Sequence, residues 1–163
     1  MKNWNERPTE IANLFNPAFC ATLLGYTARG FQAQRSSGLP WVVSFLVLPL
    51  ILHKNTRALA PKTKATKFPA WVERNPSIRV GFAERARHFV PHVREAIIFG
   101  VSAQLLRLDG SSMLLPGRAL PKLELATDSE EVRDCIRKAR SIGAVLATAG
   151  SDHTLFALLG VRE

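Results

Sequence analysis

An apolar run from Leu39 to Leu52 is the feature that most limits how this chain can fold. The run is 14 residues long and is interrupted by Pro40, Ser44 and Pro49. A membrane-spanning helix needs about 20 apolar residues, and this run is shorter. The run therefore predicts a buried helix that is kinked or restarted at Pro49. A basic flank follows it, which leaves a membrane-associated segment as the alternative.

The size and composition predict a single globular domain. The chain has 163 residues, of which 47% are hydrophobic and 21% charged, so it can bury a core and is not a disordered chain. Within the domain we expect a helical lobe at 1–68 and a second lobe at 69–163, with a hinge at 53–68. Cys20 and Cys135 are expected to be core residues in a reducing, cytoplasmic setting, since the opening residues show no secretion signal.

The first 34 residues predict two helices. Thr9 and Asn16 are good helix N-caps, and Pro17 suits a first helical turn. They indicate a short turn of helix at 10–14 and a longer helix from Pro17 toward Gln34. The large apolar residues of this region indicate a docked terminus; they are Trp4, Phe15 and Phe19.

The remainder reads as helices, a hairpin and a final strand. Helices are expected at 70–73, from Pro76 to Phe89, and again from Pro91 to Ala103, where proline restarts the helix. Asp109-Gly110 between apolar runs predicts a hairpin. Asp128 and Glu131 form a capping-box-like start for a helix, whose buried face comprises Val132, Ile136, Ala139, Gly143 and Leu146. Residues 154–161 are expected to form a strand. The fold class is therefore helix-rich α+β, with a winged-helix-like second lobe as one possible arrangement.

The positive charge is concentrated in one part of the chain. The net charge is +9, and residues 35–90 hold ten Lys and Arg against Glu73 and Glu84. A cluster without acids lies between 54 and 67 and comprises Lys54, Arg57, Lys62, Lys64 and Lys67. Such a surface attracts DNA phosphates or an acidic protein partner. The alternative is a solvated basic loop without a specific ligand.

Two helical segments carry further arginines. Arg133, Arg137 and Arg140 share one face of the last long helix and could contact phosphate. Alternatively, that face is solvated and balanced by Glu130–Arg133 and Asp134–Lys138 pairs. Arg85 and Arg87 leave the same choice between internal ion pairs and a partner contact.

No pattern of catalytic, cofactor-binding or metal-ligating residues stands out. The chain contains no phosphate-binding P-loop and no nucleophile-elbow pattern. Ser151-Asp152-His153 is best interpreted as a turn. His88 and His92 have the spacing of a helical metal pair, but Pro91 lies between them. We therefore expect a protein that is not an enzyme; a hydrolase using His88, His92 or His153 is the weakest alternative.

Several segments, in order, resemble the middle component of bacterial three-component ABC-ATPase conflict systems, the group that includes Lamassu anti-phage defence. These segments are Trp4-Asn5-x-Arg7-Pro8 with Glu10 to Cys20, Leu48 to Lys54 with Thr56-Arg57, Phe82 to Arg87, Arg94 to Ile97 with Phe99-Gly100, and Leu159-Gly160-Val161-Arg162.

The resemblance implies a non-catalytic subunit with protein partners. It would bridge an SMC/Rad50-like ABC ATPase to an effector, commonly a nuclease, and help to hold the effector inactive until foreign DNA is sensed. The high hydrophobic content suits a subunit with extensive interfaces, and the basic segment suits contact with DNA. The alternative is a stand-alone winged-helix-type DNA-binding regulator.

Overall fold

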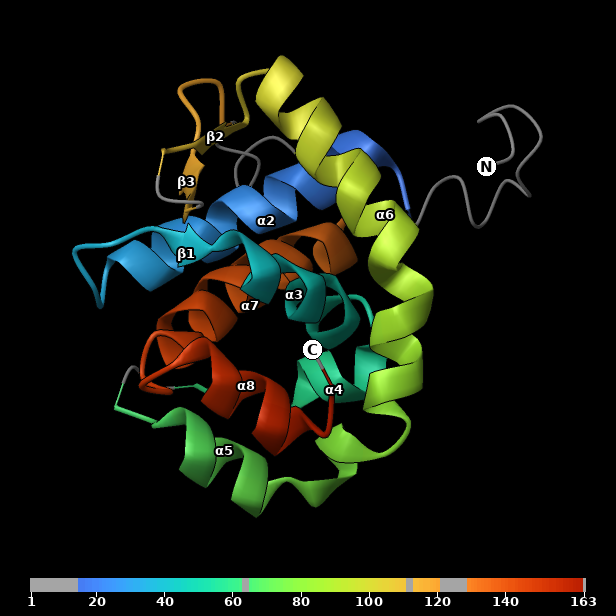
Figure 1. Ribbon diagram of the computed structural model, residues 1–163. Coiled ribbons are helices and arrows are strands. Elements are labelled where there is room, and N and C mark those ends of the chain that lie inside the picture. Colours follow the sequence, from blue (N-terminus) through green and yellow to red (C-terminus); the bar gives the residue numbers. More distant parts are fainter. Residues whose placement is uncertain (1–14, 63–64, 111–112, 121–128, 163) are drawn as a thin grey trace.

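Among the residues that the structure describes, helices predominate and are accompanied by a small sheet (Figure 1). The computed structural model describes residues 15–62, 65–110, 113–120 and 129–162. The helices are α2 (Pro17–Gln32), α3 (Ser44–Ile51), α4 (Lys54–Ala58), α5 (Phe68–Arg74), α6 (Phe82–Ser102), α7 (Glu130–Leu146) and α8 (Asp152–Leu159). Short 3₁₀ turns lie at η2 (Trp41–Val43) and η3 (Pro76–Arg79), and the strands are β1 (Leu39–Pro40), β2 (Leu106–Leu108) and β3 (Met113–Pro116). The predicted helix-rich α+β class is confirmed.

Helix α2 lies at the centre of the fold (Figure 1). The Asn16 side chain accepts a hydrogen bond from the Ala18 N–H, and Pro17 occupies the first turn, as predicted. Every residue from Cys20 to Ala28 is buried. The Thr22 and Thr27 hydroxyls donate to carbonyls one turn earlier, which lets polar side chains lie on a buried helix. Helix α2 is thus enclosed by α3, α6, α7 and the sheet.

Glycines let α2 and α7 approach at backbone distance. A Cβ atom at Gly143 of α7 would lie 2.0 Å from the Thr27 carbonyl oxygen, and one at Gly30 of α2 would lie 2.2 Å from the Arg140 carbonyl oxygen. The predicted α7 face is confirmed, since Ile136, Ala139, Gly143 and Leu146 are buried and Val132 is half-buried. Helix α7 starts at Glu130, one residue later than the pattern of Asp128 and Glu131 predicts, because its N-cap is Ser129, whose hydroxyl accepts from the Val132 N–H.

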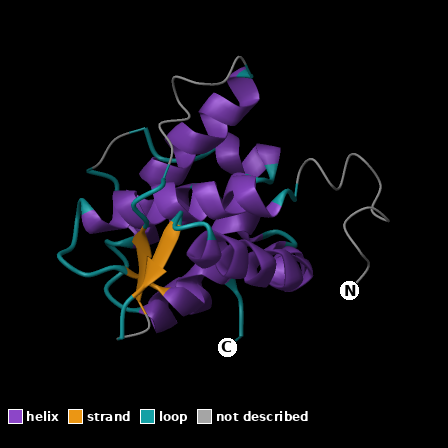
Figure 2. Cartoon of the chain, turned by 90° about the horizontal axis from the view of Figure 1, so that it is seen from above, coloured by secondary structure: helices purple, strands orange, loops and turns teal. Residues whose placement is uncertain are grey.

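The sheet is antiparallel with the order β1-β3-β2. Leu114 of β3 pairs with Leu39 of β1 on one side and with Leu108 of β2 on the other. The hairpin predicted around Asp109-Gly110 is confirmed by the β2–β3 pairing. Figure 2 shows the strands gathered at one side of the helices, where β3 packs on α2. Whether the fold is winged-helix-like stays a prediction.

The apolar run is buried but is not one helix. Leu39 and Pro40 pair with β3, residues 41–43 form η2, and only Ser44–Ile51 forms an α-helix, with Pro49 inside it. All residues from Leu46 to Ile51 are buried, so the predicted burial of the run is confirmed. The run forms three short elements instead of a single helix. In the described part of the chain, no helix has both the length and the apolar character needed to cross a membrane.

The predicted helix break at Pro91 is wrong. Helix α6 continues from Phe82 to Ser102 through Pro91. Pro91 lies on the exposed side of the helix, while Phe89 and Val93 on either side of it are buried. Packing of the flanking turns therefore outweighs the loss of one backbone hydrogen bond.

The predicted strand at 154–161 is also wrong, because residues 152–159 form α8. The Ser151 hydroxyl caps this helix by accepting from the Thr154 N–H. Leu155, Phe156 and Leu159 are buried with helical spacing. Gly160, at φ +69°, ends the helix in the left-handed conformation.

One hydrophobic core draws residues from both sides of position 68. Cys20 and Cys135 are free and buried in it, as predicted. Burial, aided by the charge of Glu95, raises the pKa of the Cys20 thiol to about 12. Several predictions lie outside the described residues: the Thr9 cap, the helical turn at 10–14, docking of Trp4, the side chain of Lys64, Asp128 of the capping box, and residues 111–112 of the hairpin.

Gly143→Ala is expected to destabilise the protein by about 2 kcal/mol or more, because its methyl group would meet the α2 backbone rather than a movable side chain. For a domain of this size we expect a Tm about 4–8 °C lower in thermal unfolding. The control is Gly110→Ala, since no atom lies within 4 Å of a Cβ there. Equal Tm values for the two variants would contradict the close backbone contact.

Candidate functional site

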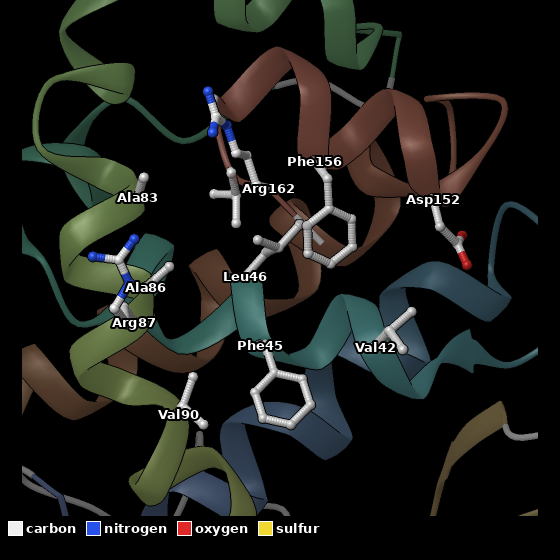
Figure 3. Close-up of a pocket in the computed structure, with 12 residues that line it drawn as sticks. Val42, Phe45, Leu46, Ala83, Ala86, Arg87, Val90, Asp152, Phe156 and Arg162 are labelled. Atoms are coloured by element: carbon white, nitrogen blue, oxygen red, sulfur yellow. The ribbon is translucent and has the colours of Figure 1, made fainter.

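An apolar groove lies between η2 and α3 on one side, α6 on the second and α8 on the third (Figure 3). Its volume is about 720 Å³, within the range of ligand-binding pockets. We call it the α6–α8 groove. It is lined by Val42, Phe45, Leu46, Ala83, Ala86, Arg87, Val90, Asp152, Phe156, Gly160, Val161 and Arg162.

The α6 side of the groove is a stripe of mostly small side chains. Ala83, Ala86 and Val90 recur at the i, i+3 and i+7 positions and therefore share one face of the helix. Helix α6 begins directly after Gly81, which has φ +61° and so turns the chain sharply into the helix. Because alanine side chains are short, the backbone of another protein can come close to α6 at this part of the groove.

The turn after α8 closes the other side. Gly160 reverses the chain, and the Val161 N–H donates to the Phe156 carbonyl oxygen at 2.9 Å. This bond is the longer-range of the two bonds of a Schellman-type helix end. It holds Val161 and Arg162 over the groove instead of letting the chain continue away from it.

A second hollow extends the groove along α6. It shares Ala83 and Gly160 with the first and also contacts Arg79 and Val80. The Val80 side chain is 74% exposed and adds apolar area beside this hollow. The two hollows together form an elongated surface rather than an enclosed cavity.

Two arginines border the groove. Figure 3 shows Arg87 on the α6 side, Arg162 on the turn after α8, and Asp152 on the side away from Arg87. Arg87 and Arg162 are exposed, and in the described part of the chain no carboxylate lies within ion-pairing distance of either. The groove therefore combines an apolar floor with two bordering arginines that form no ion pair among the described residues.

Arg85, close in sequence to the groove residues, faces inward instead. Its guanidinium lies over the Phe82 ring at 5.3 Å and is 3.5 Å from the Thr56 hydroxyl. Burial lowers the pKa of Arg85. Arg85 therefore contacts an aromatic ring and a hydroxyl inside the molecule, whereas Arg87 borders the groove.

A second apolar surface lies at the other end of α6. Ile98 is 69% exposed, and Phe99, Val101 and Leu108 of β2 are also exposed. A hollow of about 330 Å³ is lined in part by two of these residues, Val101 and Leu108. We call this the distal surface. The hollow is lined by Val101, Gln104, Leu106, Arg107, Leu108, Gly117 and Arg118.

The predicted basic cluster divides in the structure. Lys54, Lys62 and Lys67 are exposed and remain available to a partner, whereas Lys64 is outside the described residues. Arg57 is only 4% exposed. The sequence groups Arg57 with the surface lysines, but the structure turns its guanidinium inward, so it cannot serve as a surface contact.

Arg57 joins α4 to α7. Its guanidinium donates to Glu131 at 2.8 Å, to Asp134 at 3.0 Å and to the Ile51 carbonyl oxygen at 3.0 Å. The two carboxylate partners are more exposed than the arginine: the side chain of Glu131 is 68% exposed and that of Asp134 is 33% exposed. The buried charge is therefore the arginine, and it depends on both carboxylates for compensation.

Two of the α7 arginines, Arg133 and Arg137, form ion pairs along their own helix. Glu130 pairs with Arg133 at 3.1 Å and with Arg137 at 2.8 Å. These hydrogen bonds lower the pKa of Glu130, Arg137 contributing first and then Arg133. The predicted Glu130–Arg133 pair is confirmed, whereas Asp134 pairs with Arg57 and Arg137 rather than with Lys138. Arg140 is exposed, and its backbone faces Gly30.

His53 is the N-cap of α4. Its Nδ1 accepts from the Thr56 N–H at 3.3 Å and contacts the Thr56 hydroxyl at 2.8 Å. Burial, followed by the nearby charge of Arg85, lowers the pKa of His53. A neutral ring is what the cap requires, because a protonated Nδ1 cannot accept a hydrogen bond.

The other histidines have separate surroundings. His88 and His92 share the continuous helix α6, but His88 is exposed, whereas the His92 ring stacks on Phe15 at 4.2 Å. Ser151, Asp152 and His153 form the start of α8, where Ser151 is the cap. Among the residues that the structure describes, no group of three His, Cys, Asp or Glu side chains could hold a metal ion.

The family comparison matches nearly the whole chain. The model described as "ABC-three component (ABC-3C) system Middle Component 3" covers residues 4–163. The chain belongs to this family. Comparison with curated proteins and with solved structures gives no match. The resemblance to a middle component of an ABC three-component system is confirmed, and as such the protein is a component of a multi-component system.

Two segments on which the resemblance rests meet in this middle component. Residues 82–87 supply Ala83, Ala86 and Arg87 to the α6–α8 groove, and residues 159–162 supply Gly160 and Arg162. Sequence reasoning did not find the groove. The i, i+3, i+7 stripe on α6 was an available signal, but the predicted break at Pro91 and the predicted strand at 154–161 concealed it.

Removing the Glu131 and Asp134 charges together is expected to cost about 3 kcal/mol, because it leaves the Arg57 guanidinium buried without compensation. Arg57→Met is expected to cost less, about 1–2 kcal/mol, because both carboxylates can then be solvated. Urea unfolding of Glu131→Gln/Asp134→Asn and of Arg57→Met measures both. Glu130→Gln, which affects only exposed pairs, is the control and should change little. A larger loss for Arg57→Met would contradict this assignment.

His53 is expected to make stability depend on pH. Its folded pKa is lower than its unfolded value of about 6.5. Its contribution is therefore complete above that pH and is lost as the pH falls through it toward the lower folded pKa. His53→Asn keeps a capping side chain but does not titrate. Urea unfolding at pH values of about 7.5 and 5.5, on either side of the unfolded pKa, should show a smaller loss for the variant than for the wild type. Identical losses would show that His53 does not contribute.

Proposed function

We propose that this middle component is a cytoplasmic, non-catalytic subunit that joins an SMC/Rad50-like ABC ATPase to an effector, a nuclease in our proposal, in a Lamassu-like anti-phage defence system. The observation that carries the proposal is the presence of two separate apolar surfaces on one helix. The α6–α8 groove uses Ala83, Ala86 and Val90, and the distal surface uses Ile98 and Val101.

The spacing of the two surfaces supports a bridge. Ala86 and Val101 lie about 15 residues apart on a continuous helix, which corresponds to about 22 Å at about 1.5 Å per residue. That distance is large enough for two proteins to bind without sharing a surface. Exposed apolar patches of this kind are typical of interaction sites.

The helix that carries both surfaces is held rigidly. Phe82, Val93, Ala96 and Gly100 are buried, and α6 packs on both α2 and α3. A Cβ atom at Gly100 would lie 2.6 Å from Leu106 of β2, so the hairpin is seated directly on α6. A rigid connection would transmit the position of one partner to the other, which suits a subunit that controls an effector.

The exposed lysines support an additional contact with DNA phosphate. Lys54, Lys62 and Lys67 stand outside the internal ion pairs that engage Arg57, Arg133 and Arg137. Such contacts would contribute salt-dependent binding without sequence preference. Alternatively, the same lysines would face an acidic surface of the ATPase.

Co-purification of the tagged chain with the products of its neighbouring genes, after nuclease treatment, tests the bridge. Ala83→Leu should release one partner and retain the other, because it fills the groove. Ile98→Asp/Phe99→Asp should release the second partner and retain the first. Ala157→Leu, an exposed change on α8 outside the groove, is the matched control. Loss of the same single partner in both variants, or recovery of the chain alone, would contradict bridging.

A further inference from the structure

We propose that the α6–α8 groove binds a linear segment of a partner protein in which apolar anchor side chains stand beside a carboxylate. This inference rests on the proposed function and specifies the chemistry of one of its two contacts. The carboxylate pairs with Arg87 and Arg162, and the anchors occupy the floor between Phe45, Ala86 and Phe156.

The floor of the groove suits apolar anchors. In Figure 3 the side chains of Phe45, Val90 and Phe156 come from three different elements and surround one space. Interface energy is concentrated where a large side chain of one protein fills such a pocket of the other. The alanines of α6 expose little side chain, so a partner's backbone can lie close to the helix.

The shape of the groove favours a segment over a small molecule. The second hollow continues the first past Ala83 and Gly160 toward the exposed Val80. Small-molecule sites are enclosed and contain converging polar groups. Here the charged groups border the apolar floor instead. An elongated surface with charges along its border is the arrangement by which proteins bind short peptide segments.

The charges specify an acidic partner segment. Arg87 and Arg162 line the groove, Arg79 lines its extension, and no described carboxylate pairs with them. The acidic residues of the same surface are Glu84 and Asp152, and Asp152 lies at the end away from Arg87. An arginine beside a water-poor surface can bind a carboxylate with two parallel hydrogen bonds.

Peptide binding to the full chain tests the proposal directly. The probes are fluorescent, overlapping peptides of about 15 residues, long enough to span such a groove, that cover the co-encoded ATPase and effector. The readout is anisotropy. We expect binding by a peptide that contains apolar residues next to Asp or Glu. Arg87→Glu/Arg162→Glu should weaken it by about tenfold or more, as expected for losing a charge-assisted contact.

Three controls separate the groove from general effects. Arg94→Glu makes the same charge reversal as Arg87→Glu alone, on α6 two turns beyond Arg87 and outside the groove, and should change the Kd by less than about twofold. Ala83→Leu should weaken binding, whereas Ala157→Leu should not. A peptide whose acidic residue is replaced by Lys should regain affinity for Arg87→Glu/Arg162→Glu. Unchanged Tm values verify that each variant is folded.

Several results would overturn the proposal. These are binding by no peptide, binding that ignores the acidic residue, binding abolished by Ile98→Asp but not by Ala83→Leu, and filling of the groove by a second copy of the chain, seen as a dimer that Ala83→Leu dissociates. The co-purification experiment remains independent, because a partner can be retained through a folded surface when no linear peptide binds. Failure of this inference is therefore distinguishable from failure of the bridge.

Discussion

The direct backbone contact between α2 and α7 is the constraint on which the rest of the structure depends. Gly30 and Gly143 leave no side chain between the two helices. Dispersion and burial are greatest where atoms meet without voids, so this crossing fixes α7 against the central helix. Helices α3 and α6 then cover the remaining faces of α2. The groove and the distal surface both follow from where α6 is placed.

The chain between α3 and the start of α5 contacts α7 near both ends of that helix. Arg57 binds Glu131 and Asp134 near the start of α7, and the Phe68 N–H donates to the Thr148 hydroxyl just after its end. These contacts determine how the positive charge is distributed. Arg57 is buried in ion pairs within the molecule, whereas Arg87 and Arg162 lie exposed on the surface of the groove.

The positions of these features suggest how a small protein can serve two partners. One long helix carries an apolar surface near each end, and the core holds that helix along its length. The protein belongs to the middle-component family of ABC three-component systems. A component of such a system is expected to need surfaces for its partners. In our proposal the positive border of the groove selects one partner, and the uncharged apolar side chains of α6 contact the other.

The sequence by itself determined the elements whose signals are local. Asn16 and Pro17 start α2, the apolar period of α7 marks its buried face, and Asp109-Gly110 marks the hairpin. The tertiary structure alone decided the others. Packing on both sides of Pro91 keeps α6 continuous, burial of Leu155, Phe156 and Leu159 makes 152–159 a helix, and distant carboxylates bury Arg57. Local signals report propensities of a few tenths to about 1 kcal/mol per residue, and burial against segments far away in the sequence exceeds them.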